Sequence, residues 1–248
     1  MTVQNVDVVL VIDTSDSMRP CIDQLRRHLR ELVKPMQGSV NKVRFGVVAL
    51  SASHDADGNV YKVETLAGKT KSLNMLYGKG GNQYEFLTED ADKVISLLDS
   101  LKVSGDENNL LALDIALDHP FGPVSTTKRV VALFSDEQLE EGVEGAAAST
   151  HIPALIEKLH KRRVKLFCAL PYSDAAQKLS EANGSEIEAV DGGGGLSSVD
   201  FRSLLTQMGK SISVSSMQGG LEETYQRALL GQDTWVTGNF GWNDRDGR

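Results

Sequence analysis

The sequence is poor in cysteine and has no excess of basic residues. Its 248 residues include only Cys21 and Cys168, one in an expected helix and one in an expected strand. A disulfide framework is therefore not expected, and a reducing compartment is favoured. The 26 basic residues are outnumbered by 34 acidic ones, which gives a formal charge of −8. This balance disfavours nucleic acid and anionic membranes as partners, because both present phosphate.

Long hydrophobic runs and targeting segments are also missing. The apolar run nearest the N-terminus, residues 8–12, ends at Asp13 and is far shorter than the ~20 residues that span a bilayer. No signal peptide is recognisable, so we expect a cytoplasmic protein without a membrane segment. No Pro- or Ser-rich linker interrupts the chain, which favours one large domain.

Motifs that carry enzyme chemistry are absent as well. The chain has no Gly-x-Ser-x-Gly turn, no Walker loop and no Gly-x-Gly-x-x-Gly turn. The glycine run 192–195 follows a weak strand and lacks the helix register of a phosphate site. The histidines, at 28, 54, 119, 151 and 160, do not form a zinc or nucleophile-base pattern. We therefore expect that the protein is not an enzyme.

What the chain does contain is short apolar runs that alternate with amphipathic segments. Uninterrupted apolar runs are typical of strands covered on both faces, and they lie at 7–12, 44–50, 129–134 and 164–170. Apolar residues recur with helical period within 22–33, 91–101, 152–159 and 201–212. This alternation predicts a doubly wound, mostly parallel α/β sheet with helices on both faces. Ligands of such sheets bind beyond the carboxyl ends of the strands.

Two segments depart from the alternation. Residues 51–83 are too long for a tight connection and contain an alternating stretch at 60–63, which predicts an excursion with a small hairpin at the sheet edge. We assign residues 1–218 to the domain and 219–248 to a C-terminal helix and tail. The tail aromatics either dock onto another protein or fold back on the domain; they are Trp235, Phe240 and Trp242.

Oxygen-bearing side chains follow two of the expected strands. Asp13, Ser15 and Ser17 come after the first strand, and Asp136 follows the strand at 129–134. The loop at 104–109 offers Asp106 as a further ligand. Hard cations such as Mg²⁺ prefer oxygen ligands, so three loops that converge at one sheet end would form a metal site. The alternatives are a polar turn that only caps the next helix and, for Asp106, an ordinary Gly-Asp turn.

The Asp-x-Ser-x-Ser pattern after a hydrophobic first strand resembles the metal-ion-dependent adhesion site (MIDAS) of von Willebrand factor A domains. The resemblance covers roughly residues 5–215 by order of elements and implies a six-stranded, doubly wound sheet. It implies that Ser15 and Ser17 coordinate the metal directly, while Asp13 and Asp136 act mostly through water. The implied metal is Mg²⁺, with Ca²⁺ or Mn²⁺ as alternatives.

The third loop departs from the commonest family pattern. That loop usually supplies Thr, whereas Gly105-Asp106 resembles a subset with Gly-Asp that lacks the Pro-Glu often found next. Asp106 is the corresponding residue here, with Glu107 as the alternative after a one-residue shift. Three ionised aspartates would outweigh the charge of a dication. We therefore expect that the metal is held structurally or that a partner presents a neutral oxygen.

The resemblance further implies a protein-interaction or scaffold module. It points to stand-alone intracellular bacterial proteins of the tellurium-resistance and stress-cluster type, which operate beside Ser/Thr kinases, metal-dependent phosphatases or AAA ATPases. The alternative is a metal-dependent phosphohydrolase that uses Asp13, as in haloacid-dehalogenase-like enzymes. Those enzymes need a second Asp two positions later, where this chain has Ser15, which lacks the required proton affinity.

Overall fold

The structure is a computed structural model, and its described residues are 5–55, 58–66, 68–70, 86–105, 108–139, 152–182 and 185–214. Within these ranges the strands form one sheet, in the order β4-β3-β2-β1-β5-β6-β7. The strands are β1 (Asn5–Asp13), β2 (Val43–Asp55), β3 (Gly58–Thr65), β4 (Gly68–Thr70), β5 (Thr127–Phe134), β6 (Val164–Leu170) and β7 (Glu186–Ala189). The four strands expected from the apolar runs are β1, β2, β5 and β6, and all four are confirmed.

The sheet is mostly parallel, as predicted. β2, β1, β5, β6 and β7 run parallel to one another, and β3 and β4 add antiparallel strands outside β2. The parallel strands and β3 make the six strands that the resemblance implies, and the three-residue β4 is a seventh at the edge. The antiparallel β2–β3 pair lies in the segment where a hairpin was expected, and residues 71–85 lie outside the described ranges.

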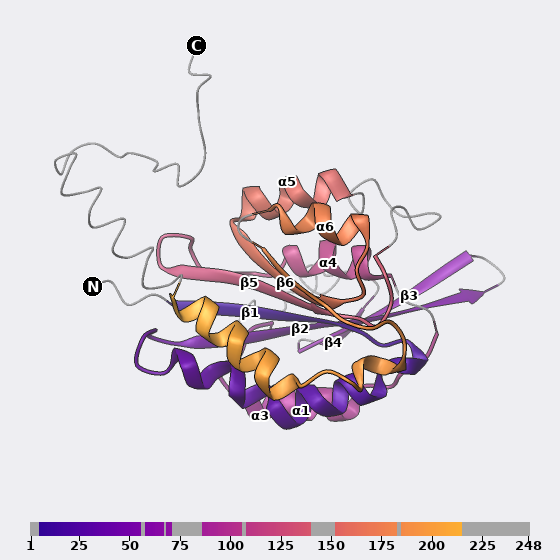
Figure 1. The fold of residues 1–248 in the computed structure, drawn as a ribbon, viewed down its shortest axis with the longest axis horizontal. Helices are drawn as coiled ribbons and strands as arrows, with labels where there is room; N and C mark the ends of the chain where they lie inside the picture. Colours follow the sequence, from indigo (N-terminus) through magenta and orange to yellow (C-terminus); the bar gives the residue numbers. More distant parts are fainter. Residues whose placement is uncertain are drawn as a thin grey trace, which may run out of the picture.

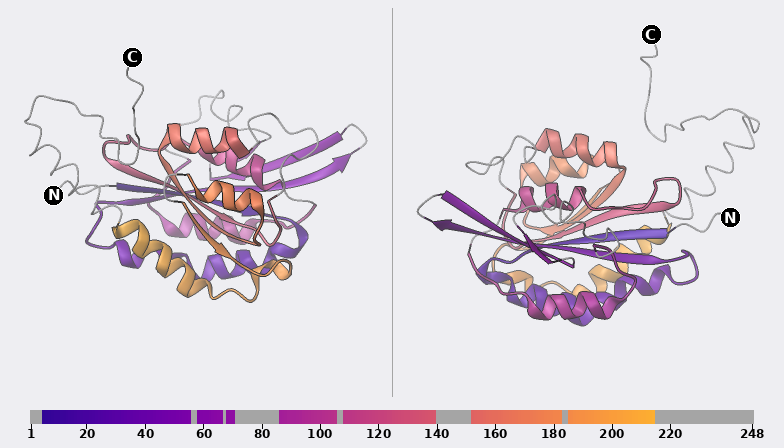
Figure 2. Two further views of the ribbon diagram at one scale, coloured as in Figure 1. Left: turned by 45° about the horizontal axis from the view of Figure 1, so that its top comes forward. Right: turned by 180° about the vertical axis from the view of Figure 1, so that it is seen from behind.

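Helices cover both faces of the sheet (Figures 1 and 2). One layer contains α1, α3 and a helix over residues 201–214, and the other contains α4, α5 and α6. Their bounds are α1 (Arg19–Val33), α3 (Ala91–Ser100), α4 (Asn109–Leu117), α5 (Ile152–Arg162) and α6 (Asp174–Ser180); short 3-10 turns are η1 (Asp16–Met18), η2 (Lys34–Met36) and η5 (Gly194–Leu196). The doubly wound α/β fold class is thus confirmed. Cys21 and Cys168 lie in the cores on opposite faces and are both free thiols.

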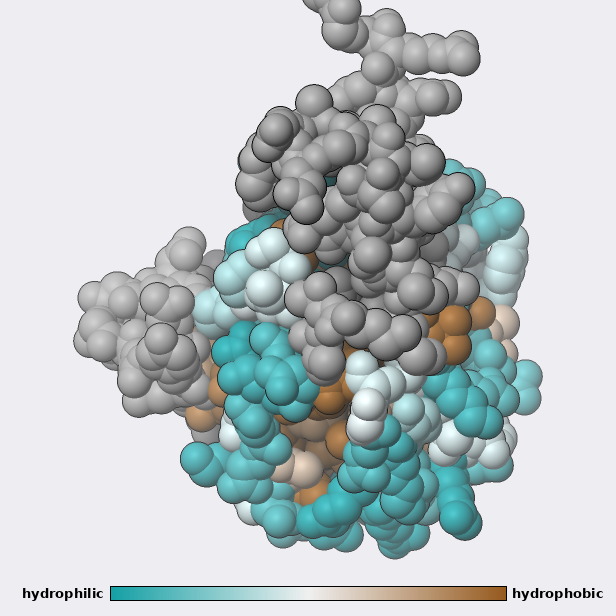
Figure 3. Space-filling model, turned by 90° about the vertical axis from the view of Figure 1, so that its left-hand side faces the viewer, coloured by the Kyte–Doolittle hydropathy of each residue, from teal (hydrophilic) through white to brown (hydrophobic). Residues whose placement is uncertain are grey.

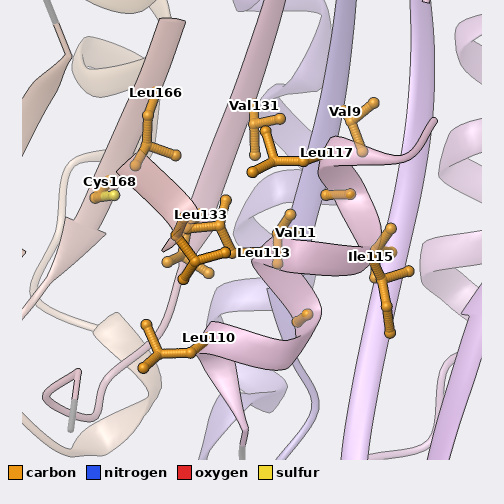
Figure 4. Packing of buried hydrophobic residues seen from close by; sticks show 14 of the residues in the cluster. Val9, Val11, Leu110, Leu113, Ile115, Leu117, Val131, Leu133, Leu166 and Cys168 are labelled. Carbon is orange, nitrogen blue, oxygen red and sulfur yellow. The ribbon is translucent and has the colours of Figure 1, made fainter. Parts of the chain in front are cut away.

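Helix α4 lies at the centre of one core (Figure 4). Leu113 and Leu117 of α4 pack beside Val11 of β1 and Leu133 of β5, and all four side chains are fully buried. Apart from Asp114, which pairs with Lys158, residues 110–117 of α4 are apolar, so they show no helical period. For this reason α4 is not among the helices expected from helical periodicity.

The amino ends of the strands are held by a buried ion pair. Asp7 of β1 is fully buried, and Arg44 of β2 donates to its two carboxylate oxygens over 2.8 and 2.7 Å. The main-chain N–H of Gly122 donates to the same carboxylate, and Arg129 donates to the Gly122 carbonyl. This network joins β1, β2 and β5 at the end opposite the candidate site.

The face seen in Figure 3 is mainly polar where it is coloured. In the view onto the end where the parallel strands begin, most of the coloured surface is hydrophilic, and hydrophobic residues show mainly towards its middle (Figure 3). Among the described residues, no helix combines the length and the hydrophobicity needed to cross a bilayer.

Candidate metal site

The first loop of the candidate site is shaped by the carboxylate that ends β1. Asp13 Oδ1 accepts a hydrogen bond from the main-chain N–H of Ser15 over 2.7 Å, which turns the chain sharply after the strand. The turn continues into η1 and α1, and it places Ser15 Oγ and Ser17 Oγ 3.4 Å apart. One carboxylate and two hydroxyls thus lie together at the carboxyl end of β1.

The second loop meets the first because β1 and β5 are neighbours in register. Ile12 pairs with Phe134, so both strands end at the same level. Ser17 Oγ donates to Asp136 Oδ1 over 2.9 Å, and Ser135 Oγ donates to Asp13 Oδ2 over 2.9 Å. The structure therefore brings Asp13, Ser15, Ser17 and Asp136 into one cluster.

The third loop is described only on its two flanks. Asp106 and Glu107, the two candidates for the third-loop ligand, lie outside the described residues. On one flank the N–H of Ser104 donates to the Thr14 carbonyl over 2.8 Å. On the other, Asn109 Nδ2 donates to Ser135 Oγ over 2.9 Å. Both flanks are therefore anchored to the first two loops.

The carboxylate of Asp136 is buried among neutral groups. Asp136 is fully buried, and its hydrogen-bond donors in the described structure are the Ser17 hydroxyl and a main-chain N–H; no Lys or Arg forms an ion pair with it there. Burial, together with the charges of Asp13 and Asp136, raises the pKa of the Cys21 thiol well above its usual value. Because a buried charge is costly unless it is paired, this site favours a cation.

The glycine run forms a wall of the site that the sequence reasoning missed. The N–H of Gly193 donates to the Asp136 carbonyl over 2.8 Å, and the N–H of Gly195 donates to Asp136 Oδ2 over 2.7 Å. Gly193, Gly194 and Gly195 all have positive φ, between 61° and 75°. A Cβ on Gly195 would lie 2.1 Å from the Ser17 carbonyl oxygen. Consecutive glycines just after a strand end were the available signal for such close backbone contact.

Two further polar residues support the cluster. Ser135 and Asn109 form a buried chain from α4 to Asp13 and fix the orientation of that carboxylate. Within the described ranges, no group of three or more His, Cys, Asp and Glu side chains is arranged to hold a metal ion. The candidate donor set instead mixes two carboxylates with two hydroxyls.

The fold is shared with a solved structure of low sequence identity. An aerotolerance-related membrane protein from Bacteroides fragilis NCTC 9343, with multiple mutations to serines, is 12% identical, with a TM-score of 0.51 over 82% of this chain and 96% of that one. The pilus adhesin SpaC from Lactobacillus rhamnosus GG is 15% identical, with a TM-score of 0.49 over 86% of this chain and 31% of that chain. No curated protein matches the sequence significantly.

The sequence itself matches one family model. The model describes the von Willebrand factor type A domain, and it aligns with residues 7–186. This range begins in β1 and ends at the start of β7, so it includes the loops that carry Asp13, Asp106 and Asp136, while the glycine run 192–195 lies beyond it. The match covers well over half of the sequence, and the chain therefore belongs to the von Willebrand factor type A domain family.

Proposed function

We propose that this protein binds a divalent cation of the magnesium class and uses the metal-bearing end of the sheet to bind a partner protein. Von Willebrand factor type A domains commonly mediate metal-dependent protein interactions. The observation that carries the proposal is the hydrogen bond between Ser17 Oγ and Asp136 Oδ1, which joins loops 119 residues apart in the sequence. It brings together the hydroxyl and carboxylate oxygens that a hard cation prefers.

The donor set fits such a cation. The site offers hydroxyl and carboxylate oxygens, from Ser15, Ser17, Asp13 and Asp136. In the sequence, Asp106 comes two residues after Ser104, which is anchored to the first loop. A bound cation would neutralise the buried charge of Asp136 and offer a coordination position to a ligand from outside. Ca²⁺ and Mn²⁺ also accept oxygen ligands and remain the alternatives.

The charge of the site favours a particular kind of partner contact. With Asp13, Asp106 and Asp136 ionised, the site stays negative after a dication binds, so it repels an incoming carboxylate. We therefore propose that the partner presents a neutral oxygen, or that it contacts the protein beside a structural metal. Loss of binding after an Asp→Ala change at the partner's contact would contradict this part of the proposal.

Metal binding can be tested by titration. We compare Mg²⁺ and Mn²⁺ binding by calorimetry for the wild type, for Ser15→Ala/Ser17→Ala, and for the control Ser100→Ala/Ser180→Ala, which changes two serines outside the site. A metal at 100 times its Kd stabilises the folded state by about 2.7 kcal/mol, so the melting temperature should rise in the wild type and the control alone. An equal rise in the site variant would contradict the proposal.

The partner surface is tested by pull-down from the native host. Proteins retained by the wild type with Mg²⁺, and lost with both EDTA and the double variant, are the expected partners. A Ser/Thr kinase, a metal-dependent phosphatase or an AAA ATPase of a cytoplasmic stress system is the class we propose. Retention that is undiminished in EDTA, with the metal verifiably removed, would show that the metal is only structural.

We propose no catalytic role for the site. Asp13 is 2% exposed, and its two carboxylate oxygens accept hydrogen bonds from the Ser15 N–H and the Ser135 hydroxyl. A nucleophilic carboxylate needs an oxygen that faces the substrate. Magnesium-dependent turnover of an aryl phosphate that is abolished by Asp13→Ala would overturn this view.

A further inference from the structure

A groove runs between β7 and the helix 201–214, on the side of the sheet away from β3 and β4. It consists of two adjoining cavities of about 280 and 330 Å³ that share Glu188, Leu204 and Gln207 in their walls. We call these two cavities together the β7 groove. None of Asp13, Ser15, Ser17 and Asp136 lines it, so it is separate from the candidate metal site.

The two ends of the β7 groove differ in chemistry. The first cavity is lined by Phe167, Ile187 and Met208 but also by Glu186 and Glu188, so its wall is about equally apolar and polar. The end at the second cavity carries the carboxylates of Glu188, Asp191 and Asp200. No Lys or Arg lines either cavity in the described part of the chain. An extended ligand would therefore meet more apolar surface at the first cavity and more negative charge at the second.

The negative charge at the second cavity is not balanced within the described structure. Glu186 is paired with Lys165, but no described residue forms an ion pair with Glu188, Asp191 or Asp200. Asp200 accepts two hydrogen bonds from Ser203, and they lower its pKa, so it stays ionised at neutral pH. The surface thus attracts a basic partner.

The open edge of β7 supplies backbone groups beside this groove. β7 is the last strand in the sheet order, and its only strand neighbour among the described residues is β6. An open edge can accept a further strand, because its outward N–H and C=O groups lack strand partners. Glu186 and Glu188 are exposed on this edge, so a second copy of β7 would bring like charges together. The edge charges disfavour self-association and favour a partner with basic residues.

We propose that the β7 groove binds an extended segment of a partner protein that pairs with the edge of β7. Side chains of such a strand alternate between its two faces, so one face enters the groove. That face carries an apolar residue for the first cavity and Lys or Arg for the carboxylates of the second. This would give the protein a second binding surface, independent of the metal.

The test uses a capped, fluorescent peptide in which threonine alternates with leucine in one half and with lysine in the other. Binding is measured by anisotropy for the wild type, for Glu188→Gln/Asp191→Asn, and for the control Glu157→Gln/Glu181→Gln, which removes equal charge from α5 and the end of α6. The groove variant should bind about threefold to tenfold more weakly, which corresponds to about 0.7 to 1.4 kcal/mol for the two exposed ion pairs that it loses. The control should bind like the wild type.

Further arms distinguish the β7 groove from the metal site and from nonspecific charge attraction. Binding should persist in EDTA and in Ser15→Ala/Ser17→Ala, so that failure of the metal proposal leaves it intact. A peptide N-methylated on alternate amides should bind poorly, because it cannot donate to the β7 edge. If the groove variant and the control lose peptide affinity equally, the peptide is held by general charge attraction, and the proposal is overturned. A dimer in sedimentation that disappears in the groove variant would likewise overturn it in favour of self-association.

Discussion

His119 makes the stability of this domain depend on pH. Its ring is fully buried between Phe86, 5.8 Å away and nearly perpendicular, and Phe121, and neither ring nitrogen has a hydrogen-bond partner among the described residues. Burial lowers the pKa of His119 to about 4, and the carbonyl of Ile115, the charge of Asp118 and the carbonyl of Ala116 oppose this shift only in part. His119 is therefore neutral in the folded protein at neutral pH.

The size of the effect follows from this pKa. An unfolded histidine has a pKa of about 6.5, so between pH 6.5 and 4 the unfolded chain binds a proton that the folded chain does not. Stability is then fully present above pH 6.5 and is lost as the pH falls. The shift corresponds to a loss of about 3 kcal/mol near pH 4 and of about 1 kcal/mol near pH 5.5.

The assay is urea unfolding of the wild type and of His119→Leu across this pH range. The variant keeps a buried apolar side chain and removes two unsatisfied nitrogens, so at neutral pH it should be at least as stable as the wild type. On acidification the wild type should lose about 3 kcal/mol more than the variant. The carboxylates are the same in both proteins, so their contribution to the pH dependence cancels in the comparison. His28→Gln, which removes a different histidine, on α1, serves as a control. Parallel pH curves for wild type and His119→Leu would refute the reasoning.

Other substitutions test the backbone and the core. Gly195→Ala should abolish metal binding in calorimetry and lower the melting temperature, because the new Cβ would overlap the Ser17 carbonyl oxygen. The control is Gly38→Ala, where φ is +80° and a Cβ would meet no atom within 4 Å, so it should lower the free energy of unfolding by only about 1 kcal/mol. Asp7→Ala removes the carboxylate from the buried Arg44 pair and should cost at least about 3 kcal/mol in urea unfolding. Leu113→Ala, fully buried in α4, should cost about 3 kcal/mol with unchanged metal affinity.

The strands and amphipathic helices could be predicted because their apolar patterns are local. Residues 8–12 are apolar without interruption, which is what burial on both faces requires of β1. β7 was harder to recognise, since its sequence Glu-Ile-Glu-Ala alternates and is mostly exposed at the sheet edge. Local pattern thus identifies the centre of the sheet better than its edges.

The residues of the candidate site that directly follow strands could be predicted from the sequence. Asp13 and Asp136 each follow a buried strand, and neighbouring parallel strands bring such residues together. The support from Ser135 and Asn109 could not be predicted in this way, because it depends on how α4 enters the core. Asp106 and Glu107 lie outside the described residues, so the third-loop assignment stays a prediction.

The glycine contacts hold the first loop in position through close backbone packing. A Cβ on Gly195 would overlap the Ser17 carbonyl at the start of α1, and a Cβ on Gly209 would lie 2.3 Å from the Leu32 carbonyl near its end. The segment 193–214 therefore approaches α1 closely at both ends, with no side chain between the backbones. Ser17 lies in η1, just before α1, so its distance from Asp136 is set by this contact and by Gly195, whose N–H donates to Asp136 Oδ2. A cation would then meet ligands that are already in place, and less of its binding free energy would be spent on ordering the loop.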